Sequence, residues 1–371
     1  MLSSLIFRGF VLLTALSLFA QNEEDYSYYE SPTELILDRE IDDLPSFGTA
    51  LVDFDQFEQG IVLEIKKIEI PGYPFAYNPS IASWRGSLLM IFRFFDPLVK
   101  TAHRIGIISL DKDFCPIGDP QIIRMDFIDT GCIRKRQDPR LIVLSDHLYL
   151  AYNNVLETDP KQELRRMCIA EVQHDGREFY VDSSEVLLYY EGLVGARSEK
   201  NWVPFDYKGN LLFAYSLLPH KILYPLFGKN SCETVSSTSS TIRWDWGVLR
   251  GGTPAILVDG EYLGFFHSTR EMPSLHSDGK IVPHYFMGAY TFSPEPPCTI
   301  TRISPEPIFN KNFYQGKNYR TWKPLHVVFP GGLIASEGAL WVAYGRQDHE
   351  IWVAKIDQKK LLETLTPVCH D

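Results

Sequence analysis

The stretch of sequence that decides the fold is RQDPRLIVLSDHLYLAYN, residues Arg136–Asn153. Two apolar runs flank the polar turn Ser145–His147, which is made of residues whose side chains bond readily to their own backbone. Pro139 stands at the start of the first run, where a residue without an N–H does not interrupt a hydrogen-bond ladder. The pattern predicts a strand, a tight turn and a second strand, with Asp138 and Arg140 at the entrance.

The same plan, followed by a third strand, recurs along the chain. The prolines that mark the units are Pro79, Pro139, Pro204, Pro254 and Pro330. Their uneven spacing does not suit a solenoid, but it suits blades with outer loops of different lengths. Because one small sheet cannot bury both of its faces alone, the repeat predicts an all-β fold, a five-bladed β-propeller. A β-sandwich with extra strands is the alternative.

Composition agrees with a turn-rich all-β protein. The chain of 371 residues contains 25 glycines and 24 prolines, which are spread along the sequence. Its formal net charge of −11 argues against non-specific binding to nucleic acid or to anionic lipid. We therefore expect no nucleic-acid partner.

The N-terminal residues resemble a secretory signal peptide. A basic start ending at Arg8 precedes an apolar run, and the chain turns acidic directly after Ala20. This run is short for a stable membrane span. We expect residues 1–20 to be a signal peptide cleaved near Ala20, residues 21–60 an N-terminal arm and residues 61–371 the propeller. The protein is then secreted, or periplasmic or lumenal. An uncleaved anchor or a buried helix is the alternative.

No motif for a metal centre is present. The six cysteines are widely spaced and none forms a C-x-x-C pair, so a zinc site is not expected. In an exported protein one or two disulfides are possible. The Ser- and Thr-rich segment 232–241 is expected to be an exposed loop between blades, and residues 359–365 a short helix.

Polar residues mark the strand ends that a propeller would bring together. The first strand of each blade lines the axis, and first-strand starts and second-strand ends share one rim because neighbouring strands are antiparallel. The acids, bases and amides at this rim suit a sugar, with or without a phosphate. These candidates are Asn78, Arg93, Asp138, Arg140, Asn153, Lys200, Asn201, Thr253, His267, Arg346 and Asp348.

Each candidate also has an ordinary structural interpretation. Asp138 could cap the turn into its strand, paired with Arg140. Lys200 could be a solvated charge and His267 a satisfied, half-buried histidine. The hypothesis of a site therefore depends on the joint placement of these residues.

A series of short motifs occurs in register from about Asn78 to Asp357. They are Asn78-Pro79, Asp138-Pro139-Arg140, Gly251-Gly252-Thr253-Pro254 and the segments 287–290, 303–308, 328–332 and 344–348. In this order they resemble the five-bladed propellers of glycoside hydrolase family 130, the β-mannoside phosphorylases and their hydrolase relatives.

The resemblance implies roles for several residues. Asp138 would donate a proton to the glycosidic oxygen through a sugar hydroxyl, and phosphate held by Arg and Lys would attack the anomeric carbon with inversion. Asp348 would hold sugar hydroxyls, and Asn78 and Arg93 would lie near the sugar or phosphate. No cofactor is expected. Inorganic phosphate is a possible co-substrate, and the partner is an oligosaccharide or glycoside.

The chain departs from the family pattern at three places. Gln137 replaces a Glu, Asn201 replaces the Asp of a Lys-Asp pair, and 215–219 replaces a His-Arg-Pro segment. The last change removes two candidate phosphate ligands. Two hypotheses follow: cleavage of a β-linked, mannose-containing glycoside by hydrolysis or phosphorolysis, and a propeller that only binds glycans or acts as a scaffold. A sialidase-like or family 43-like site is a third, with Glu199 as a second carboxylate facing Asp138.

Overall fold

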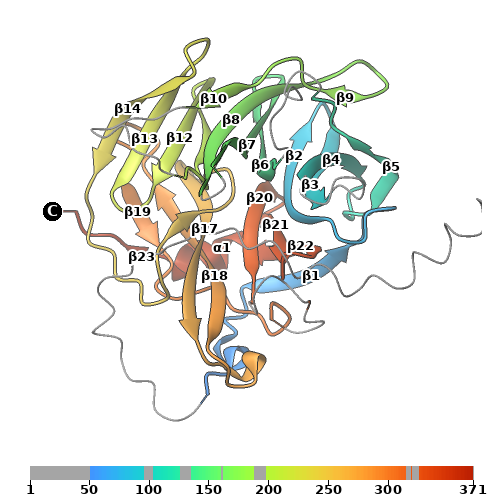
Figure 1. Cartoon of the computed structure of the whole chain (residues 1–371). Coiled ribbons are helices and arrows are strands. Elements are labelled where there is room, and N and C mark those ends of the chain that lie inside the picture. Colours follow the sequence, from blue (N-terminus) through green and yellow to red (C-terminus); the bar gives the residue numbers. More distant parts are fainter. Residues whose placement is uncertain are drawn as a thin grey trace, which may run out of the picture.

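The structure is a computed structural model that describes residues 51–95, 103–125, 135–159, 162–187, 198–314, 319 and 326–370. Five antiparallel sheets stand in a ring (Figure 1). The first strands of successive blades, β2 (Tyr77–Trp84), β6 (Gln137–Leu144) and β11 (Val203–Tyr207), contact one another, and β2 also contacts β20 (Val328–Ser336). The prediction of a five-bladed β-propeller is confirmed.

The first three blades are built from strands in sequence order, from the axis outward. The first contains β2, β3 (Ser87–Phe95), β4 (His103–Leu110) and β5 (Pro116–Ile122). The second contains β6, β7 (His147–Asp159), β8 (Gln162–His174) and β10 (Glu185–Leu187), with β9 (Phe179–Tyr180) also paired to β8. The third contains β11, β12 (Asn210–Ser216), β13 (His220–Leu226) and β14 (Ser231–Thr238).

The last two blades include chain ends. In the fourth, β15 (Arg250–Gly251) and β16 (Ile256–Val258) both pair with β17 (Glu261–Met272), followed by β18 (Val282–Phe292), β19 (Ile300–Ile303) and β23 (Thr366–Pro367). The fifth contains β20, β21 (Ala339–Arg346), β22 (Glu350–Asp357) and β1 (Val62–Ile68). The short helices are η1 (Phe54–Phe57), η3 (Leu275–Ser277) and α1 (Gln358–Thr364).

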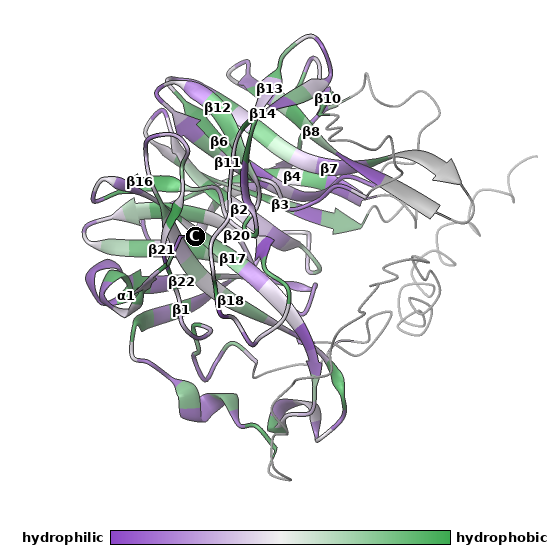
Figure 2. Ribbon diagram, turned by 90° about the vertical axis from the view of Figure 1, so that its left-hand side faces the viewer, coloured by the Kyte–Doolittle hydropathy of each residue, from purple (hydrophilic) through white to green (hydrophobic). Residues whose placement is uncertain are grey.

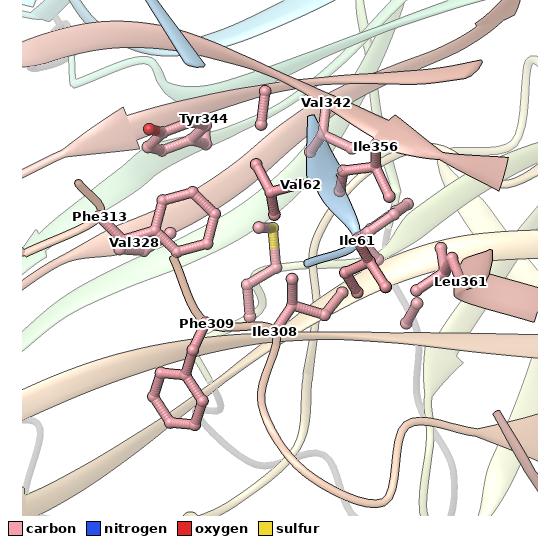
Figure 3. Close-up of a cluster of buried hydrophobic side chains, with 14 of the residues drawn as sticks. Ile61, Val62, Ile308, Phe309, Phe313, Val328, Val342, Tyr344, Ile356 and Leu361 are labelled. Atoms are coloured by element: carbon pink, nitrogen blue, oxygen red, sulfur yellow. The ribbon is translucent and has the colours of Figure 1, made fainter. Parts of the chain in front are cut away.

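Buried hydrophobic clusters fill the space between successive blades. Along β7, Leu148 and Leu150 face the first blade, whereas Tyr149 and Ala151 face the third. This period of two lets one strand supply two cores, which explains the nearly continuous apolar runs in the sequence. In Figure 2 the hydrophobic stretches lie on the strands, and hydrophilic stretches are frequent in turns and at strand ends. Figure 3 shows the cluster between the fourth and fifth blades, which α1 joins through Leu361.

The N-terminal strand closes the ring. β1 pairs antiparallel with β22, from Val62 opposite Ile356 to Ile68 opposite Ile351, so residues from both ends of the propeller form one blade. The C-terminal β23 pairs in the same way with β19 of the fourth blade. Opening the propeller therefore requires breaking a sheet as well as an apolar contact.

Two expectations can be compared with these elements. Residues 232–238 of the segment expected to be a loop instead belong to β14, the outermost strand of the third blade. Its Ser, Thr and Val residues are compatible with a strand, and its exposed face needs no apolar alternation. The C-terminal helix is confirmed within a residue as α1.

The predicted signal peptide 1–20 and the part of the predicted arm up to residue 50 lie outside the described residues, as does Cys132. The five described cysteines are free thiols: Cys115, Cys168, Cys232, Cys298 and Cys369. Of the helices in the described ranges, none has the length and apolarity needed to cross a membrane.

Candidate functional site

The candidate site lies at the end of the propeller axis where the first strands of the blades begin, and we call this region the hub. An unusual backbone conformation recurs there. Asn78, Asp138 and Asn201 precede or open the first strands of three successive blades, and all are left-handed, with φ of 47°, 52° and 62°. Asn and Asp tolerate this region far better than most residues do. The register shifts at Asn78 and at Asp138, which marks a bulge in β2 and in β6. Such a bulge turns a side chain out of the regular alternation.

The carboxylate of Asp138 accepts hydrogen bonds from side chains on three strands. Its Oδ1 accepts hydrogen bonds from Asn78 Nδ2 at 2.9 Å and Arg93 Nη1 at 2.8 Å. Its Oδ2 accepts from Asn153 Nδ2 at 3.2 Å. These donors come from β2, β3 and β7. The structure thus brings the candidates Asn78, Arg93, Asp138 and Asn153 together, and their roles in binding stay predictions.

The surroundings of Asp138 hold it in the ionised form. Burial acts to raise the pKa of this carboxyl, but the charges of Arg93 and Arg140 and the hydrogen bond from Asn78 outweigh it. The charge of Lys200 adds to the effect. The pKa of Asp138 therefore lies well below its usual range, and the group is an anion at neutral pH.

Arg93 is fixed on several sides. Its Nη2 lies 2.8 Å from His103 Nδ1, and its guanidinium lies 4.4 Å above the ring of Tyr77. Burial and the charge of Arg93 lower the pKa of His103 well below its usual value, so this imidazole is neutral and Nδ1 can accept the hydrogen bond. Arg93 is thus held in place to face Asp138.

Arg140 ties the blades of the hub to one another. It is 1% exposed, and it donates to the backbone oxygens of Asp138, at 3.0 Å, and of Gly252. A third contact, at 3.4 Å, reaches Asn201 Oδ1. The second, third and fourth blades therefore meet on one guanidinium. Its donors serve the scaffold, so Arg140 positions the site.

Asp348 supplies a second carboxyl group to the hub. It lies in the turn between β21 and β22 with φ of 52°, and it is partly exposed. Burial raises the pKa of Asp348 to about 6, against the charges of Arg93 and Lys200 and with the repulsion of Asp138. Among the described residues it makes no hydrogen bond and no ion pair. The carboxyl of Asp348 thus feels the charges of Arg93, Asp138 and Lys200, as is expected if these groups lie near one another.

His267 lies at the fourth-blade side of this group. Burial, with the charges of Arg250 and Arg140, lowers the pKa of His267 to about 3, so the ring is neutral. Its ring lies 4.7 Å from that of Phe329, and its buried Nδ1 has no hydrogen-bond partner among the described residues. Because this nitrogen is enclosed by protein atoms, a substrate-binding role for His267 stays a prediction.

Two candidates are engaged elsewhere. The hydroxyl of Thr253 accepts a hydrogen bond from the backbone N–H of Phe265 at 3.0 Å and is fully buried. Arg346 donates to Glu350 at 2.7 Å. No contact in the described part of the chain joins either side chain to Asp138. Their substrate-binding roles stay predictions.

Glu199 has structural partners as well. One carboxylate oxygen accepts from Trp202 Nε1 at 3.1 Å and the other from the Tyr215 hydroxyl at 3.3 Å. Its charge also acts on Cys232 of β14, on the outer side of the blade. The charge of Asp138 acts on the carboxyl of Asp348, whereas the hydrogen bonds of Glu199 go to Trp202 and Tyr215.

Three residues near Asp138 were not predicted from the sequence. His103 opens β4, Arg165 is the fourth residue of β8, and Tyr77 opens β2. Arg165 donates to Asn153 Oδ1 at 3.2 Å and so orients the amide that faces Asp138. A third strand runs parallel to the first, so its start lies at the same rim. Including third-strand starts would have found His103 and Arg165.

One group of side chains could hold a cation. Ligand atoms of Asp53, Asp55 and His276 lie within 4.8 Å of one another. Asp53 also caps η1, because its Oδ1 accepts from the Asp55 N–H at 3.1 Å. The group comes from η1 and η3 and does not include any rim candidate.

Comparisons with known proteins identify the fold. No protein-family model and no curated protein matches the sequence. Among solved structures, a β-1,2-mannobiose phosphorylase from Listeria innocua is 14% identical with a TM-score of 0.54, over 84% of this chain and 95% of that one. The mannose phosphorylase MPT-4 from Leishmania mexicana, solved with a phosphate ion, is 13% identical with a TM-score of 0.54, over 85% and 94%. A glycosyl hydrolase from Bacteroides ovatus is 14% identical with a TM-score of 0.53, over 80% and 87%.

At these identities the likeness shows the fold alone. The similar structures are mannoside phosphorylases and glycoside hydrolases, and their relation to this chain covers the whole propeller rather than one blade. The class that these comparisons define is therefore a class of fold, the five-bladed β-propeller.

Proposed function

We propose that the hub binds a β-linked, mannose-containing glycoside and cleaves it with inversion. The observation that carries this proposal is the pair of carboxyl groups at the hub whose pKa values are displaced in opposite directions, that of Asp138 downward and that of Asp348 upward. Cleavage of a glycosidic bond uses two carboxyl groups in different protonation states, one as an acid and one as an anion. The amides of Asn78 and Asn153 supply the oriented polar groups that a sugar requires.

The likeness to mannoside phosphorylases supports a mannose-containing substrate but does not choose the nucleophile. Phosphate binding needs cations that are free to turn toward it. Arg93 and Arg140 already donate to protein acceptors, and Tyr215 and Ser216 stand where the family has His and Arg. The loss of those two candidate phosphate ligands favours water over phosphate as the nucleophile, although Nε of Arg93 and both Nε and Nη2 of Arg346 have no hydrogen-bond partner among the described residues.

In the family resemblance Asp138 is the proton donor. For this role a substrate hydroxyl has to displace one of the donors around Asp138 and receive a proton from a carboxyl that the free site keeps ionised. That assignment stays a prediction. In either role Asp138 is the carboxylate on which the site depends.

The proposal is tested by turnover of purified protein on a panel of β-linked mannosides, with and without inorganic phosphate. We expect release of mannose without phosphate and its loss in Asp138→Asn. Asp119→Asn, an exposed position on the outermost strand β5, is the matched control and should keep full activity. Failure of the wild type to cleave any member of the panel would reject an enzymatic site.

A glycan-binding propeller without catalysis is the second candidate function. It is favoured by the hydrogen bonding of Asp138, whose two oxygens already accept from three protein donors, so that this carboxylate can serve the scaffold rather than the substrate. Binding on a glycan array that occurs without cleavage and survives Asp138→Asn would select this function.

A further inference from the structure

We infer that Asp348 gives the proton to the leaving glycosidic oxygen, while Asp138 stays an anion that stabilises positive charge on the sugar ring. This inference rests on the proposed glycosidase function and assigns the two roles that it leaves open. It reverses the division that the family resemblance implies for this chain.

The hydrogen bonding of the two carboxyl groups differs. Both oxygens of Asp138 accept from N–H donors, those of Asn78, Arg93 and Asn153. Adding a proton to this carboxylate would bring an O–H against donors that have no lone pair to offer. Asp348 has no such donors among the described residues, and the residue is partly exposed. The geometry therefore leaves Asp348 as the group that can carry a proton.

The charged and titratable groups around Asp348 come from four elements. They are Tyr77 of β2, Arg93 of β3, Asp138 of β6 and Lys200 ahead of β11. Burial and Asp138 raise the pKa of Asp348, whereas Arg93 and Lys200 lower it, and the result is about 6. An acid near the working pH is protonated often enough to act and gives up its proton readily.

The backbone next to Asp348 is fixed although its carboxyl is unbonded. The N–H of Gln347 donates to Val327 O at 3.1 Å, and Gln347 Oε1 accepts from the Val327 N–H at 3.2 Å. Its Nε2 lies 3.2 Å from His326 Nδ1. Gln347 therefore holds the turn, and Asp348 can exchange a proton without rearranging the hub.

Cleavage of the glycosidic bond requires one proton for the leaving group and releases one from the nucleophile. The Asp348 O–H transfers its proton to the glycosidic oxygen as the bond from that oxygen to the anomeric carbon breaks, and the leaving group departs as an alcohol. Water adds to the anomeric carbon from the opposite face and releases a proton to solvent, and solvent returns a proton to Asp348. If hydrogen phosphate attacks instead, its own proton is the one released. Asp138 remains an anion throughout.

The dependence on the leaving group distinguishes a proton donor from a structural residue. The 2,4-dinitrophenolate group of 2,4-dinitrophenyl β-mannoside leaves without being protonated. The leaving group of a methyl β-mannoside or of a disaccharide needs a proton. We expect Asp348→Asn to lower kcat/KM by about 10²–10⁴ on the unactivated substrate, and by less than about tenfold on the aryl substrate. Because Asn tolerates the left-handed backbone at this position, the substitution should preserve the fold.

The pH profile gives a second readout. The wild type should lose kcat/KM on the unactivated substrate as pH rises through about 6, and Asp348→Asn should lack this limb. Equal losses on both substrates, or an unchanged limb, would overturn the inference. The inference would also be overturned if the aryl substrate restored the activity of Asp138→Asn but not that of Asp348→Asn. Absence of wild-type turnover on both substrates would instead reject the proposed function, and the inference with it.

Discussion

The charge of Asp138 acts on the carboxyl of Asp348 at the hub, and the pKa values of the two groups are displaced in opposite directions. The difference arises from their partners. Asp138 receives hydrogen bonds from Asn78, Arg93 and Asn153, whereas Asp348 has none among the described residues. The residues around them therefore favour the ionised form of Asp138 and the protonated form of Asp348.

Removing Arg93 should destabilise the protein strongly. The side chains of Arg93 and Asp138 are 9% and 10% exposed, so Arg93→Met leaves a buried anion without its closest cation. We expect a loss of about 3–5 kcal/mol in the free energy of unfolding, measured by urea denaturation. The double variant Arg93→Met/Asp138→Asn should regain part of that loss, because the unpaired charge is gone. A single variant as stable as the wild type would contradict this account of the ion pair.

Asp348 should make stability depend on pH between about 4 and 6. An unfolded Asp titrates near 3.9, and the folded pKa of Asp348 is raised to about 6. The folded state therefore binds the proton more tightly, so stability falls as pH rises through this window and is greatest below it. Asp348→Asn should remove a fall on the order of 2 kcal/mol. The check is the difference between wild-type and variant unfolding free energies at pH 4 and pH 7, and an identical pH dependence would contradict it.

Asp138 should have the opposite effect at acid pH. Its folded pKa is lowered, so its contribution is fully present above about pH 4, where an unfolded Asp is ionised, and is lost as pH falls further. Asp138→Asn should flatten the acid limb of a plot of unfolding free energy against pH. If the limb keeps its slope in this variant, another carboxylate is responsible for it.

Closure of the ring should depend on Gly331. A Cβ added there would lie 2.3 Å from the backbone oxygen of Pro79, at the contact between β20 and β2. Gly331→Ala should therefore cost about 3 kcal/mol or more of stability, measured as a loss in unfolding free energy. Gly338→Asn is the control, because a Cβ at this turn meets nothing within 4 Å and Asn tolerates its positive φ of 73°. Equal effects of the two substitutions would argue against the close approach.

Glu199→Gln tests the third hypothesis for the site. Its carboxylate accepts from Trp202 and Tyr215, so we expect reduced stability and a change in kcat/KM below about tenfold. The substitution and Asp348→Asn should be assayed side by side on the same glycoside. A loss of activity for Glu199→Gln that matches that of Asp348→Asn would restore the pairing of Glu199 with Asp138.

The repeat and the strand ends were sufficient to predict much of the hub. Antiparallel strands of fixed order force Asn78, Arg93 and Asn153 to the same rim as Asp138. The direction of each side chain at that rim was not predictable, because bulges interrupt the alternation of faces. Arg346 reaches the expected strand end, yet its guanidinium donates to Glu350.

Other parts of the structure depend on contacts between distant residues. Pairing of β1 with β22 joins residues 62–68 to residues 351–356, and no local pattern in the sequence predicts this pairing. β14 was mistaken for a loop because its polar residues face outward on an edge strand. The pKa values of Asp138 and Asp348 likewise arise from four elements that meet only in the folded hub.

The most direct test of the central claim is a crystal structure of Asp138→Asn with an unactivated β-mannoside. We predict a sugar ring in the hub, with its hydroxyls within about 3.2 Å of the Asn78 and Asn153 amides. The glycosidic oxygen should lie within the same distance of the Asp348 carboxyl. A sugar bound on an outer face of the blades, with the hub holding only water, would contradict the claim that this propeller handles carbohydrate at its axis.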